Sequence, residues 1–283
     1  FSGQWPGLVG LLNTGASLTS LGRQHSRIWT DAADWTAELA GHVREQLVEW
    51  PVDLDPEALA AALVEVCDAP LGPLASGHTL RSLPLRDRLR ELDFELPIGG
   101  GDQPVDDPRI LGDIAGLLRR HLPADDPLRA NADALDRPAL GEQVLRGFLT
   151  GSVDVVFRIS GDEHDRFVIC DYKTNWLGDS DAPLTAAAYT PARLAAAMGH
   201  SSYPLQALLY AVVLHRFLRW RLPDYDPERH LGGVVYLYLR GMCGARTPVV
   251  DGSPCGVFSW RPPAALVVAL SDLLDGAPVG GAR

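Results

Sequence analysis

Apolar residues recur at helical spacing in several segments. Residues 34–50, "DWTAELAGHVREQLVEW", alternate apolar and charged positions with the period of an amphipathic helix. Residues 55–70, "DPEALAAALVEVCDAP", repeat this pattern behind an acidic first turn, which favours a helix start. Three further segments predict helices: 109–122, with Pro123 just beyond, the long segment 203–221, and 263–275.

Other segments carry the patterns of strands. Residues 88–98 alternate from Leu89 onward, as in a strand with one polar face. Residues 151–159 and 166–172 flank the turn-like "SGDEHD" and predict a hairpin. Residues 232–241, "GGVVYLYLRG", read as a buried strand. The order helix, strand, strand, strand, helix, strand predicts an α/β or α+β fold, a mixed sheet flanked by helices.

Residues 1–33 differ in composition from the rest. Residues 1–30 contain no Asp or Glu, although the chain has 36, and they show no helical or strand period. The chain also begins without a methionine. We expect residues 1–33 to be poorly ordered or loosely packed, the result of a truncation, an alternative start or a reading-frame change. We expect residues 34–283 to form one domain.

Composition and charge exclude several classes of function. A net charge of −11 argues against nonspecific nucleic-acid binding by the whole surface, although "HRFLRWR" (215–221) can form a local basic patch. The four cysteines form no C-x-x-C pair, and no P-loop or G-x-S-x-G motif occurs. No apolar run is long enough to span a bilayer, and no signal peptide opens the chain. We therefore expect a cytoplasmic protein without a membrane partner.

A pair of aspartates is brought together by the predicted hairpin. If its turn is centred between Asp162 and Glu163, Asp154 lies directly opposite Asp171 on one face of the sheet. Their Cβ atoms would be about 5 Å apart. Lys173, two residues past Asp171, projects from the same face, and Tyr172 projects from the other.

Two opposed carboxylates repel each other unless one takes a proton or a cation lies between them. Oxygen ligands at this spacing suit Mg²⁺ or Mn²⁺, which activates water and polarises a phosphoryl oxygen. Lys173 is the only lysine in a chain with 25 Lys and Arg residues. A compact ammonium suits a role near developing charge better than a guanidinium. The alternative is a solvated strand face with a surface ion pair.

Four stretches in order, "RGFLTGSVDVVFR", "DYKTNWLG", "LQALLYAVVLHRFLRWRLPDYD" and "HLGGVVYLYLRG", resemble the C-terminal nuclease domain of the RecB family, part of exodeoxyribonuclease V (RecBCD). The resemblance runs from about residue 69 to residue 262. It implies a restriction-endonuclease-like PD-(D/E)XK core, with the catalytic core at about 86–262. It also implies a Mg²⁺-dependent deoxyribonuclease, with Mn²⁺ as a substitute, for DNA repair and recombination.

The resemblance assigns roles to residues that match the family's motifs. Asp154 and Asp171 match its two metal-binding aspartates, and Lys173 its catalytic lysine. Tyr172 matches the residue whose backbone carbonyl also reaches the metal. Glu91 matches the acidic residue of the first core strand; by itself it could equally lie on a solvated strand face.

Gln206 and Tyr210 match the family's Q-x-x-x-Y helix. At spacing i, i+4 they share one helix face and can approach the site together; Tyr210 could also be an ordinary core residue. The implied partners are DNA, as linear duplex ends and single strands, and RecC-like and RecD-like subunits. No helicase motors occur in this chain, so we expect it to be a fragment, with ATP dependence in the missing part.

The N-terminal segment departs from the family's pattern. The family's first core helix carries a metal-binding histidine in a G-T-x-x-H-like stretch, which is absent here. His25 is the nearest candidate ligand, with the wrong flanking residues, and His78 falls where the family has a variable loop. A weakened nuclease is therefore expected. The alternative is a non-cleaving module with a nuclease fold that binds DNA or a subunit; another nuclease of the same fold, such as a resolvase, is disfavoured by the match after "DYK".

Overall fold

The computed structural model describes residues 35–49, 53, 55–102 and 108–276. Predictions about residues 1–33, His25 included, lie outside these described residues. In the part of the chain that the structure describes, no helix is both long and apolar enough to cross a membrane.

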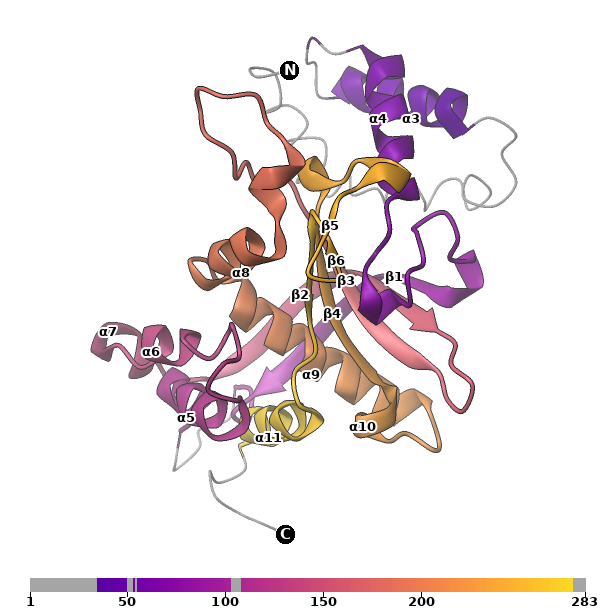
Figure 1. The fold of residues 1–283 in the computed structure, drawn as a ribbon. Helices are drawn as coiled ribbons and strands as arrows, with labels where there is room; N and C mark the ends of the chain where they lie inside the picture. Colours follow the sequence, from indigo (N-terminus) through magenta and orange to yellow (C-terminus); the bar gives the residue numbers. More distant parts are fainter. Residues whose placement is uncertain (1–34, 50–52, 54, 103–107, 277–283) are drawn as a thin grey trace.

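A mixed five-stranded sheet forms the centre of the fold, in the order β1-β2-β3-β4-β7 (Figure 1). β1, β2 and β3 are antiparallel neighbours, β4 runs parallel to β3, and β7 is antiparallel to β4. The strands span Arg88–Ile98 (β1), Gly147–Ile159 (β2), Arg166–Lys173 (β3), Leu231–Tyr238 (β4) and Val257–Trp260 (β7). A separate small hairpin contains Val249–Val250 (β5) and Ser253–Pro254 (β6).

Helices connect the strands. The parallel pair β3 and β4 needs a crossover connection, and the chain between them contains the longest described helix, α9. The α-helices are Trp35–Glu49 (α3), Pro56–Asp68 (α4), Leu111–His121 (α5), Asn131–Leu135 (α6), Pro138–Gly141 (α7), Pro191–Gly199 (α8), Tyr203–Arg221 (α9), Pro227–His230 (α10) and Ala264–Leu274 (α11). Short 3₁₀ turns span Pro73–Ala75 (η1), Leu85–Asp87 (η2), Ala186–Tyr189 (η3), Leu239–Gly241 (η4) and Gly244–Arg246 (η5).

Each face of the sheet has its own hydrophobic core. On one face, alternate residues of β3 and β4, such as Ile169 and Val234, pack with α5, α8, α9 and α11. On the other face, Cys170 and Val235 pack with α3 and α4. Figure 1 shows α5, α9 and α11 well separated from α3 and α4. The sheet is therefore covered on both faces, which explains the nearly continuous apolar run of β4.

Most predicted elements are confirmed. The helices predicted at 34–50, 55–70, 109–122, 203–221 and 263–275 are α3, α4, α5, α9 and α11. The strands predicted at 88–98, 151–159, 166–172 and 232–241 are β1, β2, β3 and β4. β2 begins earlier than predicted, at Gly147, and β4 ends earlier, at Tyr238, where the 3₁₀ turn η4 follows. The prediction did not include β7 or α8, which come from a four-residue segment and an Ala-rich stretch.

A β-bulge fixes how β4 pairs with β3. Phe167 pairs with Leu231 but Val168 pairs with Gly233, so Gly232 is an extra residue on β4. Gly233 has φ of +100°, and a Cβ there would lie 2.7 Å from the backbone oxygen of Trp260. Only glycine fits this position, and the pairing that follows brings Asp171 opposite Tyr236.

The Gly233→Ala substitution should destabilise the protein by about 3 kcal/mol, because it adds backbone strain and a clash with β7. Gly116 in α5 is the matched control, since a Cβ there meets nothing within 4 Å. Gly116→Ala should stabilise by about 0.5–1 kcal/mol. Urea unfolding of both variants measures these changes; a Gly233→Ala midpoint equal to that of the unmutated chain would contradict the role of the bulge.

Candidate active site

The β2–β3 hairpin has the predicted register. Ile159 pairs with Arg166, Phe157 with Val168 and Val155 with Cys170, which places Asp154 and Asp171 at the next position of the two strands. The backbone pairing of β2 with β3 ends there. Beyond it, the Asp154 side chain connects the two strands, because its Oδ2 accepts a hydrogen bond of 3.0 Å from the backbone N–H of Tyr172. The aspartates come together because the turn sets the pairing.

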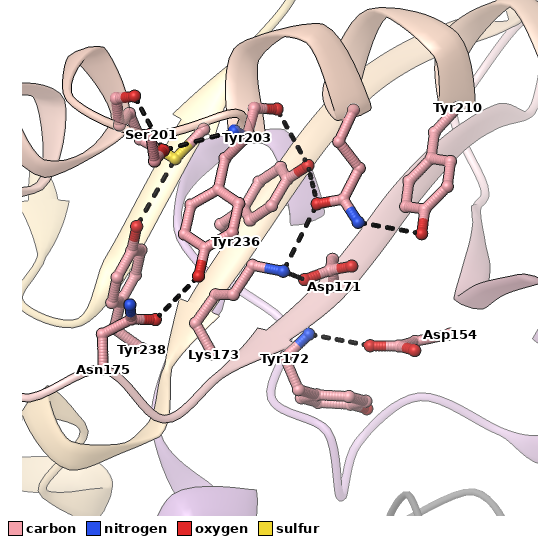
Figure 2. A network of polar contacts seen from close by, with 12 residues as sticks. Asp154, Asp171, Tyr172, Lys173, Asn175, Ser201, Tyr203, Tyr210, Tyr236 and Tyr238 are labelled. Carbon is pink, nitrogen blue, oxygen red and sulfur yellow. Dashed lines mark hydrogen bonds and ion pairs between the residues drawn. The ribbon is translucent and has the colours of Figure 1, made fainter. Parts of the chain in front are cut away.

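Lys173 lies on the same face as Asp171 (Figure 2). Its Nζ forms an ion pair with Asp171 Oδ2, in surroundings that leave the two side chains only 12% and 5% exposed. The interpretation of Asp171 and Lys173 as a solvated surface pair is therefore wrong. Tyr172 projects from the opposite face and packs against the core under α3 and α4, as predicted.

Gln206 and Tyr210, one turn apart on α9, connect this helix to the site. Lys173 Nζ donates to Gln206 Oε1 over 3.3 Å, and Gln206 Nε2 donates to the Tyr210 hydroxyl over 3.0 Å. Tyr210 in turn donates to the backbone oxygen of Ser152 on β2, 2.9 Å away. The predicted approach of both residues to the site is therefore observed, and Tyr210 is part of a polar chain rather than of the core alone.

Burial sets the electrostatics of the two carboxylates. It raises the pKa of Asp171 to about 6, against the lowering effect of Lys173 and with a further raising effect from Asp154. Burial also raises the pKa of Asp154, while the Tyr172 N–H and Lys173 act in the opposite direction. Desolvation disfavours two neighbouring anions, so a bound cation would relieve a cost that the fold imposes. Burial raises the pKa of Tyr210 to about 12, which keeps its hydroxyl a donor at neutral pH.

Glu91 lies at an irregular position of β1. Its neighbours Arg90 and Leu92 pair with Val155 and Val153, so Glu91 is opposite Asp154 in the backbone. Its φ of +46° is unusual for a side chain other than glycine. β2 is also irregular at Asp154. Residues two apart on a regular strand share a face, whereas Val153 and Val155 lie in the cores of opposite faces of the sheet. The structure thus aligns three acidic residues on adjacent strands at one irregular level.

The donor atoms suit a hard divalent ion, although they are few. Within residues 35–49, 53, 55–102 and 108–276, no group of three or more His, Cys, Asp and Glu side chains is arranged to hold a metal. Mg²⁺ commonly uses only one or two carboxylates and completes its shell with water and phosphate oxygens. Asp154 and Asp171 fit that requirement. His78 hydrogen-bonds Ser82 at an exposed position, consistent with a surface role.

Two aromatic residues of the site were missed by the sequence analysis. The rings of Tyr203 on α9 and Tyr236 on β4 lie beside Lys173 (Figure 2), with Nζ 4.2 Å and 5.0 Å from their centroids. The alternation of "VVYLYL" indicates that Tyr236 and Tyr238 share a face, but which face depends on the bulge in β4. Tyr203 stands three residues before Gln206, which was the available signal.

Known proteins resemble this chain closely. RecB, the RecBCD enzyme subunit of Mycolicibacterium smegmatis, is 58% identical over 273 residues, which cover 95% of this chain and 25% of that protein. RecB of Mycobacterium tuberculosis is 56% identical over 93% of the chain and 24% of its own length. RecB of Escherichia coli is 36% identical over 76% of the chain and 15% of its length. Because the 95% match is longer than residues 34–283, it extends into the N-terminal segment.

No protein-family model matches the chain. The chain spans about a quarter of the length of the mycobacterial relatives. Over most of its own length, the chain is homologous to RecB, a subunit of the RecBCD enzyme.

Proposed function

We propose that this chain is the nuclease module of a RecB-type subunit, a metal-dependent deoxyribonuclease with a PD-(D/E)XK core. The observation that supports it most is the meeting of Asp154, Asp171 and Lys173 at one level of the β2–β3 hairpin, in a buried setting. Two carboxylates and an ammonium of this kind are the groups that phosphodiester hydrolysis needs. Homology to RecB supports a role in DNA repair and recombination.

Each residue has a distinct proposed role. Asp154 and Asp171 would hold Mg²⁺ or Mn²⁺, and the Tyr172 carbonyl is the third proposed ligand. When bound, such an ion lowers the pKa of water and polarises a phosphoryl oxygen. Lys173 would stabilise charge that develops on the phosphate. Gln206 and Tyr210 would orient Lys173 through the hydrogen-bond chain described above.

Two further residues are proposed as parts of the site. Glu91 is proposed as an additional acidic group, supported by its position opposite Asp154. His25 is the nearest candidate for the family's metal-binding histidine, although its flanking residues depart from the family's pattern, and it lies outside the described residues.

The proposed partners follow from the homology to RecB. They are DNA, as duplex ends and single strands, and RecC-like and RecD-like subunits. ATP would act through helicase motors outside this chain, as the resemblance to the RecB family implies.

A non-cleaving DNA- or subunit-binding module is the second candidate. The observation that favours it is the lack of a three-ligand group among the described residues. The two candidates differ in one measurable respect, because a binding module retains DNA without cutting it when Mg²⁺ is supplied.

The purified chain should cut linear DNA when Mg²⁺ is added and remain inactive with EDTA. Asp171→Asn should lower the rate by at least about a hundredfold, because it removes a charged oxygen from the cation site. Asp162→Asn is the matched control, since Asp162 is exposed in the turn of the same hairpin, and its rate should be unchanged. DNA retention in a gel without any cleavage under these conditions would favour the binding module.

Lys173→Ala should reduce cleavage by about a hundredfold or more while DNA affinity stays within about twofold, because the ammonium acts on transition-state charge. Lys173→Arg should also be poor, since a planar guanidinium does not fit a site built for a point charge. Single-turnover rates and fluorescence anisotropy measure the two quantities. Full activity in either variant would contradict the assigned role.

Mg²⁺ affinity should fall as pH is lowered through about 6. The pKa of Asp171 is raised to about 6, so its carboxylate takes up a proton in that range, and the proton competes with the cation. Above the pKa the carboxylate is ionised and the affinity should reach a plateau. Calorimetric titration between about pH 5 and pH 8 measures this. Asp171→Asn should bind weakly at every pH, and an affinity of the unmutated chain that does not change with pH would contradict the assignment.

A further inference from the structure

We propose that Tyr203 and Tyr236 form an aromatic cradle that positions the ammonium of Lys173, and that both are positioning residues for the reaction. This inference rests on the proposed nuclease function. Neither tyrosine was identified from the sequence, and they come from different elements, α9 and β4, that meet over the end of β3 (Figure 2).

The geometry is that of a cation held by aromatic rings. Nζ of Lys173 lies 4.2 Å from the centroid of the Tyr203 ring and 5.0 Å from that of Tyr236. The two rings stack with centroids 5.8 Å apart and planes 27° apart. A cation within about 6 Å of a ring centroid is attracted by the ring quadrupole, and the attraction grows when water is excluded. The Lys173 side chain is only 12% exposed, so the attraction acts with little screening.

Hydrogen-bond directions fix the orientation of the Gln206 amide, which lies between the hydroxyls of Tyr210 and Tyr236. The Ser152 backbone oxygen can only accept, so the Tyr210 hydroxyl donates to it and accepts from Gln206 Nε2. Gln206 Oε1 therefore faces the lysine and accepts from Lys173 Nζ and, over 3.0 Å, from the Tyr236 hydroxyl. The Tyr236 hydroxyl, which also lies 3.3 Å from the Tyr203 backbone oxygen, thus contacts the amide that accepts from the ammonium.

Tyr236 is well suited to this role. It is fully buried, and burial keeps its pKa far above the usual range, so the hydroxyl remains a donor. It pairs with Asp171 across the β3–β4 ladder, which places its ring next to the ion pair. Tyr203 is more accessible, and its hydroxyl donates to the Asn175 side chain over 3.2 Å. Two groups therefore position the ammonium in ways that can be tested separately. The ring of Tyr203 contacts it directly, and the hydroxyl of Tyr236 acts through Gln206.

The cradle has a specific purpose at this site. Asp171 is both the ion-pair partner of Lys173 and a proposed cation ligand. A carboxylate that serves a cation holds the ammonium less firmly, and a free lysine side chain regains rotamer freedom. The two rings and Gln206 keep the ammonium in place without a second negative charge. A second carboxylate in that position would instead pair with the ammonium and cancel the positive charge that it presents to the phosphate.

The single lysine makes the cradle directly observable. In protein labelled with ¹³C-lysine, Lys173 gives the only lysine side-chain signals, and ring currents from Tyr203 should shift its ε-methylene protons upfield. Tyr203→Leu should remove most of that shift. Tyr203→Phe keeps the ring and should retain it. The spectra are recorded without metal or DNA, and the unedited proton spectrum of the same sample verifies the fold.

Cleavage kinetics test the positioning role. Tyr203→Leu should lower kcat about tenfold with KM for DNA nearly unchanged, and Tyr203→Phe should restore the rate to within about twofold. Tyr236→Phe keeps the buried ring and removes the hydroxyl, so it should lower kcat severalfold without unfolding the chain. A purely structural role of Tyr203 would not predict a loss confined to kcat in Tyr203→Leu together with a nearly normal kcat in Tyr203→Phe.

The outcomes separate the cradle from the proposed function. If the Lys173 signals of Tyr203→Leu stay at the upfield positions of the unmutated chain, the cradle is wrong whatever the activity. If the signals move but kcat stays within twofold, the rings contact the ammonium without positioning it, and the proposal is overturned. If the unmutated chain cuts no DNA, the proposed function fails, while the spectra still decide whether the cradle exists.

Discussion

Desolvation of two neighbouring carboxylates, the buried Asp171 and the half-buried Asp154, is the constraint around which this site is arranged. Burial raises the pKa of both Asp154 and Asp171, and groups at the end of β3 stabilise the two ionised carboxylates. Asp154 accepts from the backbone N–H of Tyr172, and Asp171 pairs with Lys173. Both partners come from the last two residues of β3. The end of β3 therefore supplies the Asp171 carboxylate, the Tyr172 N–H donor and the Lys173 ammonium. Because all three come from one strand end, the site depends on the pairing of β3 with β2 and β4.

The pairing on the β2 side could be predicted from the sequence, because a short turn and strict alternation leave one register. The turn at 160–165 placed Asp154 opposite Asp171, and the structure agrees. The β4 side could not be predicted, since it depends on one extra glycine whose effect appears only in three dimensions. Tyr236 was missed for this reason, although its strand was identified.

Two other features lay beyond sequence patterns. β1 was predicted as a regular alternating strand, whereas Glu91 adopts a positive φ there. A local backbone reversal of this kind leaves no periodic signal. β7 is only four residues long and pairs with β4, and a segment this short shows too few alternating positions to stand out as a strand. The elements found from sequence were long and strongly periodic, which is where local pattern determines structure.

The bulge at Gly232 decides which face of the sheet the later side chains of β4 occupy. Successive residues of a strand face opposite sides, so a regular ladder that included both glycines would turn every later side chain of β4 to the other face. Val235 would then lie opposite Asp171 in place of Tyr236, and the hydroxyl of Tyr236 would enter the core under α4. Deletion of Gly232 alone would keep the pairing from Gly233 onward, whereas a residue added or lost between Gly233 and Tyr236 would change the side chain that faces Lys173. The number of residues between these two positions is therefore as important to the site as their side chains.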